Sequence, residues 1–377
     1  MELFGGTYRG KRILLTGHTG FKGSWLSLWL MELGAEVTGY SLPPPTSPSL
    51  FEAARLERSL RHIEADVRDS HRLHRIVAET LPHAVVHLAA QPLVRLSYKI
   101  PDETIETNVM GTVNLLEAVR SVASSRHPIA VVIVTSDKCY ANRDVVCDFH
   151  EEDPLGGCDP YSMSKAGAEL AISAWRQSFF PPDRIGEHGV RLASARAGNV
   201  IGGGDWGIDR VMTDCILALR EGRPVELRNP AATRPWQHVL DPLSGYLHLL
   251  ALLLIQDPAT SGMYADAWNL GPSPAEAWTV ARLVEEAIKK WGSGSWKNVA
   301  DSGGLHEAKV LSLNCDKARL RLGWNPVWDV PTSIAMTISW FKRYYAGEDV
   351  RALTLENVAD YVLDATRRKM PWTVPLE

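Results

Sequence analysis

Two short groups of polar residues in the middle of the chain could carry out acid–base chemistry on an alcohol. Tyr161 and Lys165 are four positions apart in a segment of good helix formers, so both side chains should project from one face of a helix. An ammonium group beside a phenol lowers the pKa of the phenol, which can then accept a proton from a hydroxyl group. Ser136, Asp137 and Lys138 supply a hydroxyl, a carboxylate and an amine in direct succession. We predict that these five residues are catalytic.

The position of both groups within the predicted fold supports this interpretation. Residues 131–134 form a run of β-branched side chains, which is typical of a buried parallel strand. Open α/β sheets place their chemistry just beyond the carboxyl ends of such strands, where Ser136 and its two neighbours would lie. A Tyr-x-x-x-Lys pair on its own is more often a solvent-exposed helix face, so its meaning depends on this context.

The first strand-to-helix turn has the glycine spacing of a dinucleotide-binding loop. Residues 11–16 predict a strand, Gly17, Gly20 and Gly23 follow it, and residues 24–33 have helical apolar spacing. Such glycines let the backbone approach a pyrophosphate, whose charge a helix N-terminus favours. The alternative is an ordinary tight turn, but the strand before and the helix after favour a cofactor site. Three further residues of this turn are predicted to bind the cofactor: Thr19, Phe21 and Lys22.

Later strands predict the rest of the cofactor site. The second strand, residues 34–40, has no acidic residue at its end to bind a ribose, so we expect comparatively loose cofactor binding. Asp66 ends the third strand and could contact adenine or cap the following helix. Asn108 is the polar exception in an apolar helix, residues 104–119, where it could hold backbone groups in place. The remaining predicted cofactor-binding residues are Val67, Leu88, Ala89, Ala90, Gln91, Asn108, Thr135, Tyr161 and Lys165.

Strands and helices alternate as far as residue 199, which predicts an α/β fold with a doubly wound parallel sheet. A glycine-rich loop after residue 199 then marks the change from one lobe to the next. We therefore predict two domains, 1–199 and 200–377, with about 236–262 returning to the first domain. Arginines in the loops could clamp a diphosphate, although any one of them could simply face solvent. The predicted substrate-binding residues are Arg95, Ser97, Asn199, Arg210, Arg228 and Arg234.

The composition limits the classes of partner and the compartment. The 377 residues are 45% hydrophobic and 22% charged, which suits a large globular core. A net charge of -4 gives no basic surplus for nucleic acid or for an anionic membrane surface. We expect neither a leader segment nor a membrane span. The cysteines lack the spacing of metal ligands, so we expect no metal, reduced thiols and a cytoplasmic location. They are Cys139, Cys147, Cys158, Cys215 and Cys315.

The joint pattern resembles the extended short-chain dehydrogenase/reductase family, whose epimerases and dehydratases act on nucleotide sugars. The resemblance covers nearly the whole chain, and the residues that carry it are Gly17, Gly20, Gly23, residues 87–90, Asn108, Tyr161 and Lys165. It implies a Rossmann-type domain that binds NAD and a smaller, mixed C-terminal lobe that binds the substrate. It also implies a homodimer or homotetramer, because the helices bearing Asn108 and Tyr161 commonly form a four-helix interface in this family.

Residues 17–25, 90–97 and 135–138 are most similar to family members that act on CDP-glucose. The resemblance implies a 4,6-dehydratase, a lyase whose product is CDP-4-dehydro-6-deoxyglucose, a precursor of dideoxysugars in lipopolysaccharide O-antigens. Most 4,6-dehydratases of nucleotide sugars carry Asp-Glu where this chain carries Asp137 and Lys138, so the chain departs from that pattern. Asp137 nevertheless favours elimination over epimerisation.

Roles for the five predicted catalytic residues follow from the resemblance. Tyr161, assisted by Lys165, takes the proton of the C4 hydroxyl, which Ser136 orients. Lys138 is the base at C5 and Asp137 is the acid at C6. These last two roles need a neutral lysine and a protonated aspartate, and desolvation would shift both pKa values in those directions. A structural salt bridge between Asp137 and Lys138 is the alternative.

The sequence leaves two alternative functions open. One is another enzyme on the same fold, a 4,6-dehydratase or 4-epimerase of a different nucleotide sugar such as GDP-mannose or UDP-glucose, because the base preference depends on loop contacts. The other is a dinucleotide-binding regulator without catalysis, which predicts a disrupted pair at positions 161 and 165. The pair is intact, so we favour the enzyme.

Overall fold

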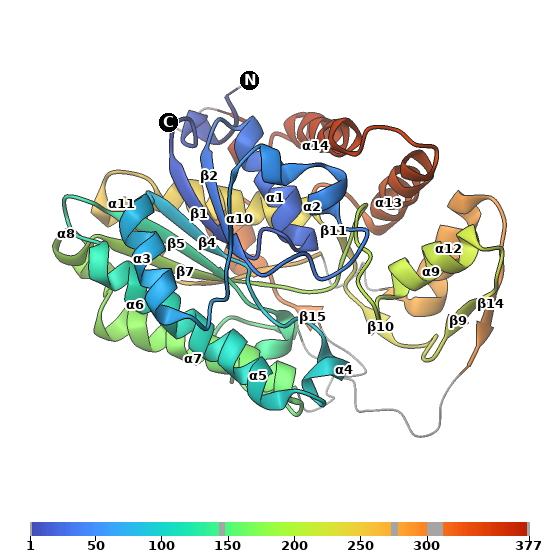
Figure 1. Cartoon of the computed structure of the whole chain (residues 1–377), viewed down its shortest axis with the longest axis horizontal. Helices are drawn as coiled ribbons and strands as arrows, with labels where there is room; N and C mark the ends of the chain where they lie inside the picture. The colour runs from blue at the N-terminus through green and yellow to red at the C-terminus, as the bar shows by residue number, and fades with distance from the viewer. Residues whose placement is uncertain (1, 143–147, 273–277, 300–311, 375–377) are drawn as a thin grey trace.

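The computed structural model describes residues 2–142, 148–272, 278–299 and 312–374 and is centred on a parallel β-sheet (Figure 1). Within these ranges, seven strands pair in the order β12-β7-β5-β4-β1-β2-β3, and each of these pairings is parallel. The chain moves outward from β1 on both sides, which confirms the predicted doubly wound α/β fold. The strands are β1 (Arg12–Thr16), β2 (Glu36–Ser41), β3 (Arg61–Glu64), β4 (Ala84–His87), β5 (Ile129–Val134), β7 (Val190–Ala197) and β12 (Ala267–Leu270).

The central strands are buried on both faces, as their apolar sequences predict. All six residues of β5 and all eight of β7 are buried. Val131 and Ile133 pack in one apolar core with Leu115, whereas Val132 and Val134 pack in another. The alternation arises because successive side chains of a strand point to opposite faces of a sheet. The carboxyl end of β5 leads directly into the predicted catalytic segment.

Helices cover both faces of the sheet (Figure 1). One face carries α3 (Ser70–Thr80), α6 (Gly111–Val122) and α7 (Pro160–Ser178), whose apolar side chains join the same core as Val131. The other face carries α1 (Phe21–Glu32) and α10 (Leu240–Leu253). Every residue of α10 is buried, so this helix belongs to the interior of the sheet domain.

A second group of elements lies to the right of the sheet in Figure 1 and includes the parallel pair of β9 and β14. Its elements are α9 (Val211–Arg220), β9 (Val225–Leu227), α12 (Val280–Trp291) and β14 (Trp296–Asn298). Two long helices, α13 (Val330–Tyr345) and α14 (Val350–Arg367), complete the fold. Both β12 and α10 follow residue 200 in the chain but pack in the sheet domain. The structure therefore sets no single boundary between two domains, and the division into 1–199 and 200–377 stays a prediction.

The short elements fill the connections. The helical ones are η1 (Leu3–Gly6), α2 (Leu50–Ala53), η2 (Leu56–Arg58), α4 (Val94–Ser97), α5 (Pro101–Ile105), η3 (Glu106–Met110), η4 (Asp137–Cys139), η5 (Pro182–Arg184), α8 (Ile185–His188), α11 (Pro258–Gly262), η7 (Ala318–Leu322) and η8 (Pro371–Thr373). The strands are β6 (Asp148–Phe149), β8 (Val200–Ile201), β10 (Thr233–Arg234), β11 (Gln237–His238), β13 (Trp278–Thr279) and β15 (Ser312–Leu313).

One predicted helix differs from the structure. The helix expected at 104–119 begins earlier, at Pro101 in α5, runs through the π-helical turn η3 and ends as α6. Proline suits the first turn of a helix, which accounts for the earlier start. Asn108 lies within η3, and π turns occur frequently at functional sites.

Aromatic packing joins the two ends of the described chain. Phe4 in η1 stacks on Trp372 in η8, with ring centroids 5.1 Å apart, and both side chains are fully buried. Other tryptophans also pack the core, since the largest fully buried side chains include Trp25, Trp29, Trp268, Trp324, Trp340 and Trp372.

Three observations bear on membranes, metals and thiols. None of the helices in the described ranges has both the length and the apolar character that crossing a membrane requires. In the same ranges, no three His, Cys, Asp or Glu side chains gather as metal ligands would. The described cysteines are free thiols, and Cys147 lies outside the described residues.

Candidate active site

The glycine turn between β1 and α1 is packed so closely against the end of β4 that side chains are excluded. Gly17 has a φ of +74°, and a Cβ at this position would lie 2.6 Å from the backbone nitrogen of Ala89. A Cβ at Gly23 would lie 2.1 Å from the carbonyl oxygen of Gly17. The turn therefore needs glycine at both positions, for reasons of close backbone approach.

The N-terminus of α1 fits the diphosphate of a dinucleotide. Gly20 is the N-cap residue, and it offers no side chain to bind the first N–H groups of the helix. Such groups favour an anion, and the helix dipole adds to this preference. Thr19 fixes the turn to the end of β2, because its hydroxyl hydrogen-bonds Ser41 Oγ at 2.8 Å and donates to Leu42 O at 2.9 Å. Phe21 lies against Gly202, where a Cβ would come within 3.1 Å of its ring.

Asp66 lies beyond β3, but its carboxylate already has a partner. Its Oδ2 accepts hydrogen bonds from Arg68 Nε and Nη2 at 2.9 and 2.7 Å, and the backbone of Arg68 donates to its Oδ1 at 2.8 Å. The residue that caps the following helix is Asp69, whose Oδ1 accepts from Arg72 N at 2.9 Å. The helix-cap alternative for Asp66 is thus wrong, and its contact with adenine stays a prediction. Val67 beside it is buried.

Asn108 connects the loop after β4 to α7. Its Oδ1 accepts from Gln91 N at 2.8 Å, and its Nδ2 donates to Gln91 O at 3.0 Å and to Ser164 Oγ at 2.8 Å. Ser164 in turn donates to Tyr161 O at 2.7 Å. The expectation that Asn108 holds backbone groups in place is confirmed. Leu88, Ala89, Ala90 and Gln91 are partly exposed in this loop, so a ligand can reach them.

The structure brings four of the five predicted catalytic side chains together in a buried position. Ser136, Asp137, Tyr161 and Lys165 are 6%, 2%, 7% and 6% exposed. Ser136 Oγ donates to Asp137 Oδ1 at 2.9 Å, and Lys165 Nζ donates to Val134 O at 3.4 Å. Lys138 follows in the short turn η4 and is partly exposed. Its backbone N–H donates to Ser136 Oγ at 3.2 Å.

Burial controls the pKa values of the tyrosine and lysine in this group. It raises the pKa of Tyr161 to about 12, against a lowering by a hydrogen bond with Ser136. It lowers the pKa of Lys165 to about 8. The expected lowering of the Tyr161 pKa by Lys165 is therefore wrong for this structure, because the ammonium binds a backbone carbonyl and burial outweighs the hydrogen bond.

Burial shifts the pKa of Asp137 in the direction that favours its protonated form. Burial raises its pKa, and the nearby charges of Lys138, Arg234 and Lys22 only oppose this shift. Its Oδ2 is buried without a hydrogen-bond partner among the described residues, and a Cβ at Gly198 would lie 2.9 Å from it. No ion pair joins the side chains of Asp137 and Lys138, both within the described ranges, so the salt-bridge alternative is not supported. An unpartnered buried oxygen of this kind is typical of functional sites.

The surroundings of Lys22 and Tyr246 show that the glycine turn lies beside the catalytic residues. Lys22 Nζ is 3.5 Å from Tyr246 OH. Burial lowers the pKa of Lys22 to about 8, and the charges of Arg210 and Lys165 lower it further. Burial raises the pKa of Tyr246, as do the nearby charges of Asp137 and Tyr161. Tyr246 was not predicted from the sequence, because it lies within the leucine-rich helix α10.

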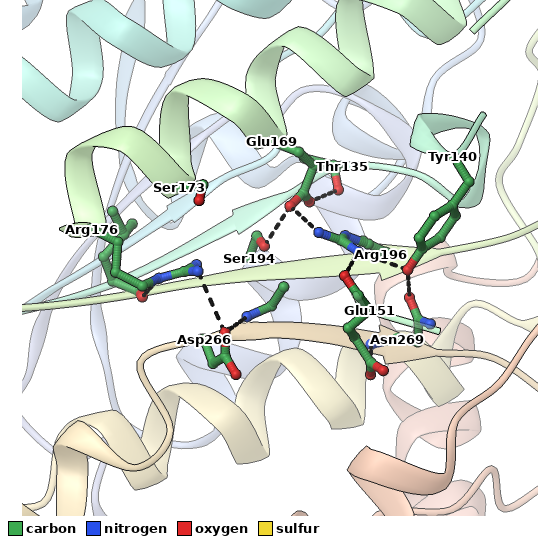
Figure 2. A network of polar contacts seen from close by, with 12 residues as sticks. Thr135, Tyr140, Glu151, Glu169, Ser173, Arg176, Ser194, Arg196, Asp266 and Asn269 are labelled. Atoms are coloured by element: carbon green, nitrogen blue, oxygen red, sulfur yellow. Dashed lines mark hydrogen bonds and ion pairs between the residues drawn. The ribbon is translucent and has the colours of Figure 1, made fainter. Parts of the chain in front are cut away.

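A buried polar network joins α7 to β7 (Figure 2). Its centre is the ion pair of Glu169 in α7 and Arg196 in β7, 2.7 Å apart. Thr135, a predicted cofactor-binding residue, donates its hydroxyl to Glu169 at 2.5 Å. This pair was not predicted from the sequence, although an arginine inside a buried strand was a signal for it.

The predicted substrate-binding arginines differ in their partners and in their burial. Arg95 and Arg228, from opposite halves of the chain, both pair with Asp209 Oδ1, at 3.6 and 3.2 Å. Arg210 pairs with Asp205 at 2.7 Å. Arg234 is buried, and its charge acts on Asp137.

The other two predicted substrate-binding residues have backbone partners. Ser97 is fully buried, donates to Val94 O at 2.6 Å and accepts from Tyr161 N at 3.1 Å, so it fixes the start of α7. Asn199 accepts a hydrogen bond from Gln237 N through its carbonyl oxygen. Substrate contacts of both residues stay predictions.

Known proteins resemble the chain over most of its length. Residues 14–337 match the family model described as GDP-mannose 4,6 dehydratase. The chain is 47% identical to CDP-glucose 4,6-dehydratase of Salmonella typhimurium (strain LT2) over 360 aligned residues. The alignment covers 96% of this chain and 98% of that protein. The structure of dTDP-glucose 4,6-dehydratase from Bacillus anthracis in complex with NAD matches with a TM-score of 0.71 and 22% identity over 89% of this chain and 97% of that one. UDP-glucose 4-epimerase from Thermotoga maritima with UDP-glucose matches with a TM-score of 0.70 and 21% identity over 89% and 99%. At these identities, the two structures show a shared fold alone.

Gly23→Ala should destabilise the protein, because its Cβ would lie 2.1 Å from the carbonyl oxygen of Gly17. Overpacking of this kind costs about 1–3 kcal/mol of unfolding free energy. Gly20→Ala is the matched control, since a Cβ there comes no closer than 3.4 Å to the same oxygen. Urea unfolding of both variants measures the difference, and equal stabilities would show that the turn has room for a side chain.

Lys165→Met should remove a pH-dependent loss of folding stability, which arises because the charged ammonium of Lys165 is buried. The pKa of Lys165 is about 8 in the folded chain against 10.5 for the free side chain, so between these values the unfolded chain binds more protons and stability rises with pH. Below pH 8 the variant should be more stable than the unchanged protein by about 3 kcal/mol, and this difference should disappear above pH 10.5. Urea unfolding at pH 7 and pH 10 measures it.

Lys289→Met serves as the control for the pH experiment. The side chain of Lys289 is 76% exposed, so its replacement should change stability by less than about 0.5 kcal/mol at either pH. If the difference between Lys165→Met and the unchanged protein were the same at both pH values, the ammonium of Lys165 would not be desolvated.

Proposed function

The chain belongs to the family described as GDP-mannose 4,6 dehydratase, and we propose that it is an NAD-dependent 4,6-dehydratase of CDP-glucose. The reaction oxidises C4, eliminates water across C5 and C6, and reduces C6, which gives CDP-4-dehydro-6-deoxyglucose. The observation that carries the proposal is the 47% identity, over nearly all of both chains, to CDP-glucose 4,6-dehydratase of Salmonella typhimurium. The buried group of Tyr161, Ser136 and Asp137 supports the same chemistry.

NAD suits the turn at residues 17–23 and the loop after β4. The uncapped N-terminus of α1 favours its diphosphate, and Asn108 holds the loop at residues 88–91 against α7. When bound, NAD supplies a hydride acceptor for C4 and a hydride donor for C6.

Tyr161 removes the proton of the C4 hydroxyl, which Ser136 orients. Burial raises the pKa of Tyr161, so the phenolate needs positive charge close by. Lys165, a buried ammonium one helical turn away on the same helix, supplies part of that charge. Removal of this proton makes C4 ready to give up a hydride.

Elimination uses the two residues that follow Ser136. The C4 ketone acidifies the hydrogen at C5, which Lys138 removes and later returns. Asp137 gives a proton to the departing C6 hydroxyl, and the raised pKa of its buried carboxyl suits an acid. This is the step that separates a dehydratase from a 4-epimerase, because a 4-epimerase needs no acid at C6.

The proton count of one cycle assigns a second task to Ser136. Tyr161 gains the C4 hydroxyl proton, and Asp137 loses one to the water that leaves, whereas Lys138 ends as it began. The next cycle therefore needs a proton to pass from Tyr161 to Asp137. Ser136 hydrogen-bonds Tyr161 and donates to Asp137 Oδ1 at 2.9 Å, so its hydroxyl offers the shortest route.

A homodimer or homotetramer through α6 and α7 is part of the proposal. Three large apolar side chains on this pair of neighbouring helices and the adjoining π turn are exposed: Met110 by 48%, Met163 by 41% and Leu170 by 59%. Contact with the same face of a second copy would bury them in a four-helix interface.

The compartment and the pathway follow from the same proposal. Free thiols among the described cysteines suit a reducing cytoplasm. The product of a CDP-glucose 4,6-dehydratase is a precursor of dideoxysugars, so the enzyme serves lipopolysaccharide O-antigen synthesis.

Incubation with CDP-glucose and NAD should give a product lighter by one water, measured by mass spectrometry. UDP-, GDP- and dTDP-glucose should react more slowly, and Tyr161→Phe should lower turnover of CDP-glucose by about 10²–10⁴-fold because it lacks the proton acceptor. Asp137→Asn has nearly the shape of Asp137 but cannot act as the acid, so it should also lower water loss. A product of unchanged mass would indicate an epimerase, and no reaction with any of the sugars would contradict enzymatic function.

Leu170→Glu should dissociate the oligomer, because it places a charge in the apolar interface. Sedimentation velocity measures the mass of the particle. The matched control is Leu320→Glu, at a leucine that is 83% exposed on η7 and outside the proposed interface. An unchanged mass for Leu170→Glu would place the interface elsewhere.

A further inference from the structure

The buried ion pair of Glu169 and Arg196 has no role in the reaction described so far (Figure 2). The two residues are 2% and 3% exposed, and Arg196 Nη2 lies 2.7 Å from Glu169 Oε2. Glu169 accepts further hydrogen bonds from Thr135 at 2.5 Å and from Ser194 at 2.9 Å. A buried ion pair is seldom more stabilising than apolar residues of the same volume, so stability alone does not explain it.

One side of the pair fixes the helix that carries the oxidation chemistry. Glu169 lies one helical turn after Lys165 on α7, and its negative charge raises the pKa of Lys165 against the effect of burial. Thr135, which binds the other carboxylate oxygen, immediately precedes Ser136. The carboxylate of Glu169 therefore holds α7 at a fixed position against the ends of β5 and β7.

The other side of the pair reaches the turn that carries the elimination chemistry. Arg196 Nη1 donates to Tyr140 OH at 2.7 Å, and Tyr140 OH donates to Asn269 Oδ1 at 2.7 Å. Asn269 Nδ2 donates in turn to Phe149 O at 2.8 Å, so the amide that accepts from Tyr140 is itself fixed. The phenol hydroxyl thus has one donor and one acceptor, which fixes its orientation. Tyr140 comes directly after η4, the turn that contains Asp137.

We propose that Arg196 and Tyr140 are positioning residues for the elimination of water. The ion pair fixes two elements relative to each other. One is α7, which carries the residues for oxidation at C4, and the other is the turn η4, which carries the residues for loss of the C6 hydroxyl. The hydroxyl of Tyr140 is the link from Arg196 to η4, so its removal loosens Asp137 and Lys138 and leaves α7 in place. This inference rests on the proposed dehydratase function.

Tyr140→Phe tests the link with little change in packing. The ring of Tyr140 stacks on Phe149, with centroids 4.9 Å apart and planes 6° apart, and phenylalanine can keep that stack. Turnover of CDP-glucose should fall about 10- to 100-fold, because a small misplacement of reacting groups is enough for such a loss.

Kinetic isotope effects identify the step that is slowed. With CDP-glucose deuterated at C5, the isotope effect on turnover should be larger for Tyr140→Phe than for the unchanged enzyme, because elimination becomes the slowest step. With CDP-glucose deuterated at C4, the isotope effect should be smaller. Each effect is a ratio measured on one protein, so a lower folded fraction would move neither.

Tyr361→Phe is the matched control. Tyr361 is also fully buried, and its hydroxyl also has two partners, Asp241 Oδ1 at 2.8 Å and Ser244 Oγ at 3.0 Å, but it lies in α14 outside the network. Its loss of thermal stability should resemble that of Tyr140→Phe, while turnover per folded molecule and both isotope effects should stay as in the unchanged enzyme.

Two outcomes would overturn the inference. One is a Tyr140→Phe enzyme with unchanged turnover, and the other is reduced turnover with both isotope effects unchanged. Failure of the proposed function is a different result, because the unchanged chain would then release no water from CDP-glucose before any variant is compared.

Discussion

Charged side chains are buried at the carboxyl edge of the sheet, and the cost of removing them from water shapes the whole site. The chain meets this cost in three different ways. Glu169 is surrounded by donors and pairs with Arg196, so it stays ionised and rigid. Lys165 donates to a backbone carbonyl, and burial lowers its pKa although the charge of Glu169 opposes the shift. Asp137 has one oxygen without a partner, and its pKa rises. The ion pair of Glu169 and Arg196 forms the scaffold, whereas Lys165 and Asp137 can exchange protons.

The sheet supplies the geometry that these charges need. Because β5 is buried on both faces, its carboxyl end is held by two cores, and the polar residues that follow have little freedom. The glycine turn approaches the same edge from β1, and Lys22 extends from it to Tyr246. The cofactor loop follows β1 and the acid follows β5, two parallel strands that are distant along the chain but separated only by β4 in the sheet, and α7 adds the proton acceptor at the same edge.

Local patterns in the sequence were enough to predict part of this arrangement. The apolar run of β5, the glycines before α1 and the spacing of Tyr161 and Lys165 are each contained in a short segment, and the structure brings them together at the predicted edge. The role predicted for Asp137 as an acid needed desolvation, and its side chain is 2% exposed.

The rest depends on contacts between distant segments, which a single sequence does not display. Glu169 and Arg196 meet across the interface of a helix and a strand, and Lys22 meets Tyr246 from the opposite half of the chain. The pKa of Tyr161 was predicted in the wrong direction for the same reason. The spacing to Lys165 could be read from the sequence, but the depth of burial, which raises the pKa, is set by the whole fold.

The stack of Phe4 on Trp372 brings the first and last turns of the described chain into direct contact. Terminal segments usually fray independently of the domain and of each other, at little cost in free energy. Here each end provides part of the apolar surface that buries the other, since both rings are fully covered. Detachment of either end therefore exposes aromatic surface at both. The first and last turns of the described chain should open together as one cooperative unit, so that hydrogen exchange in the two gives the same free energy of opening.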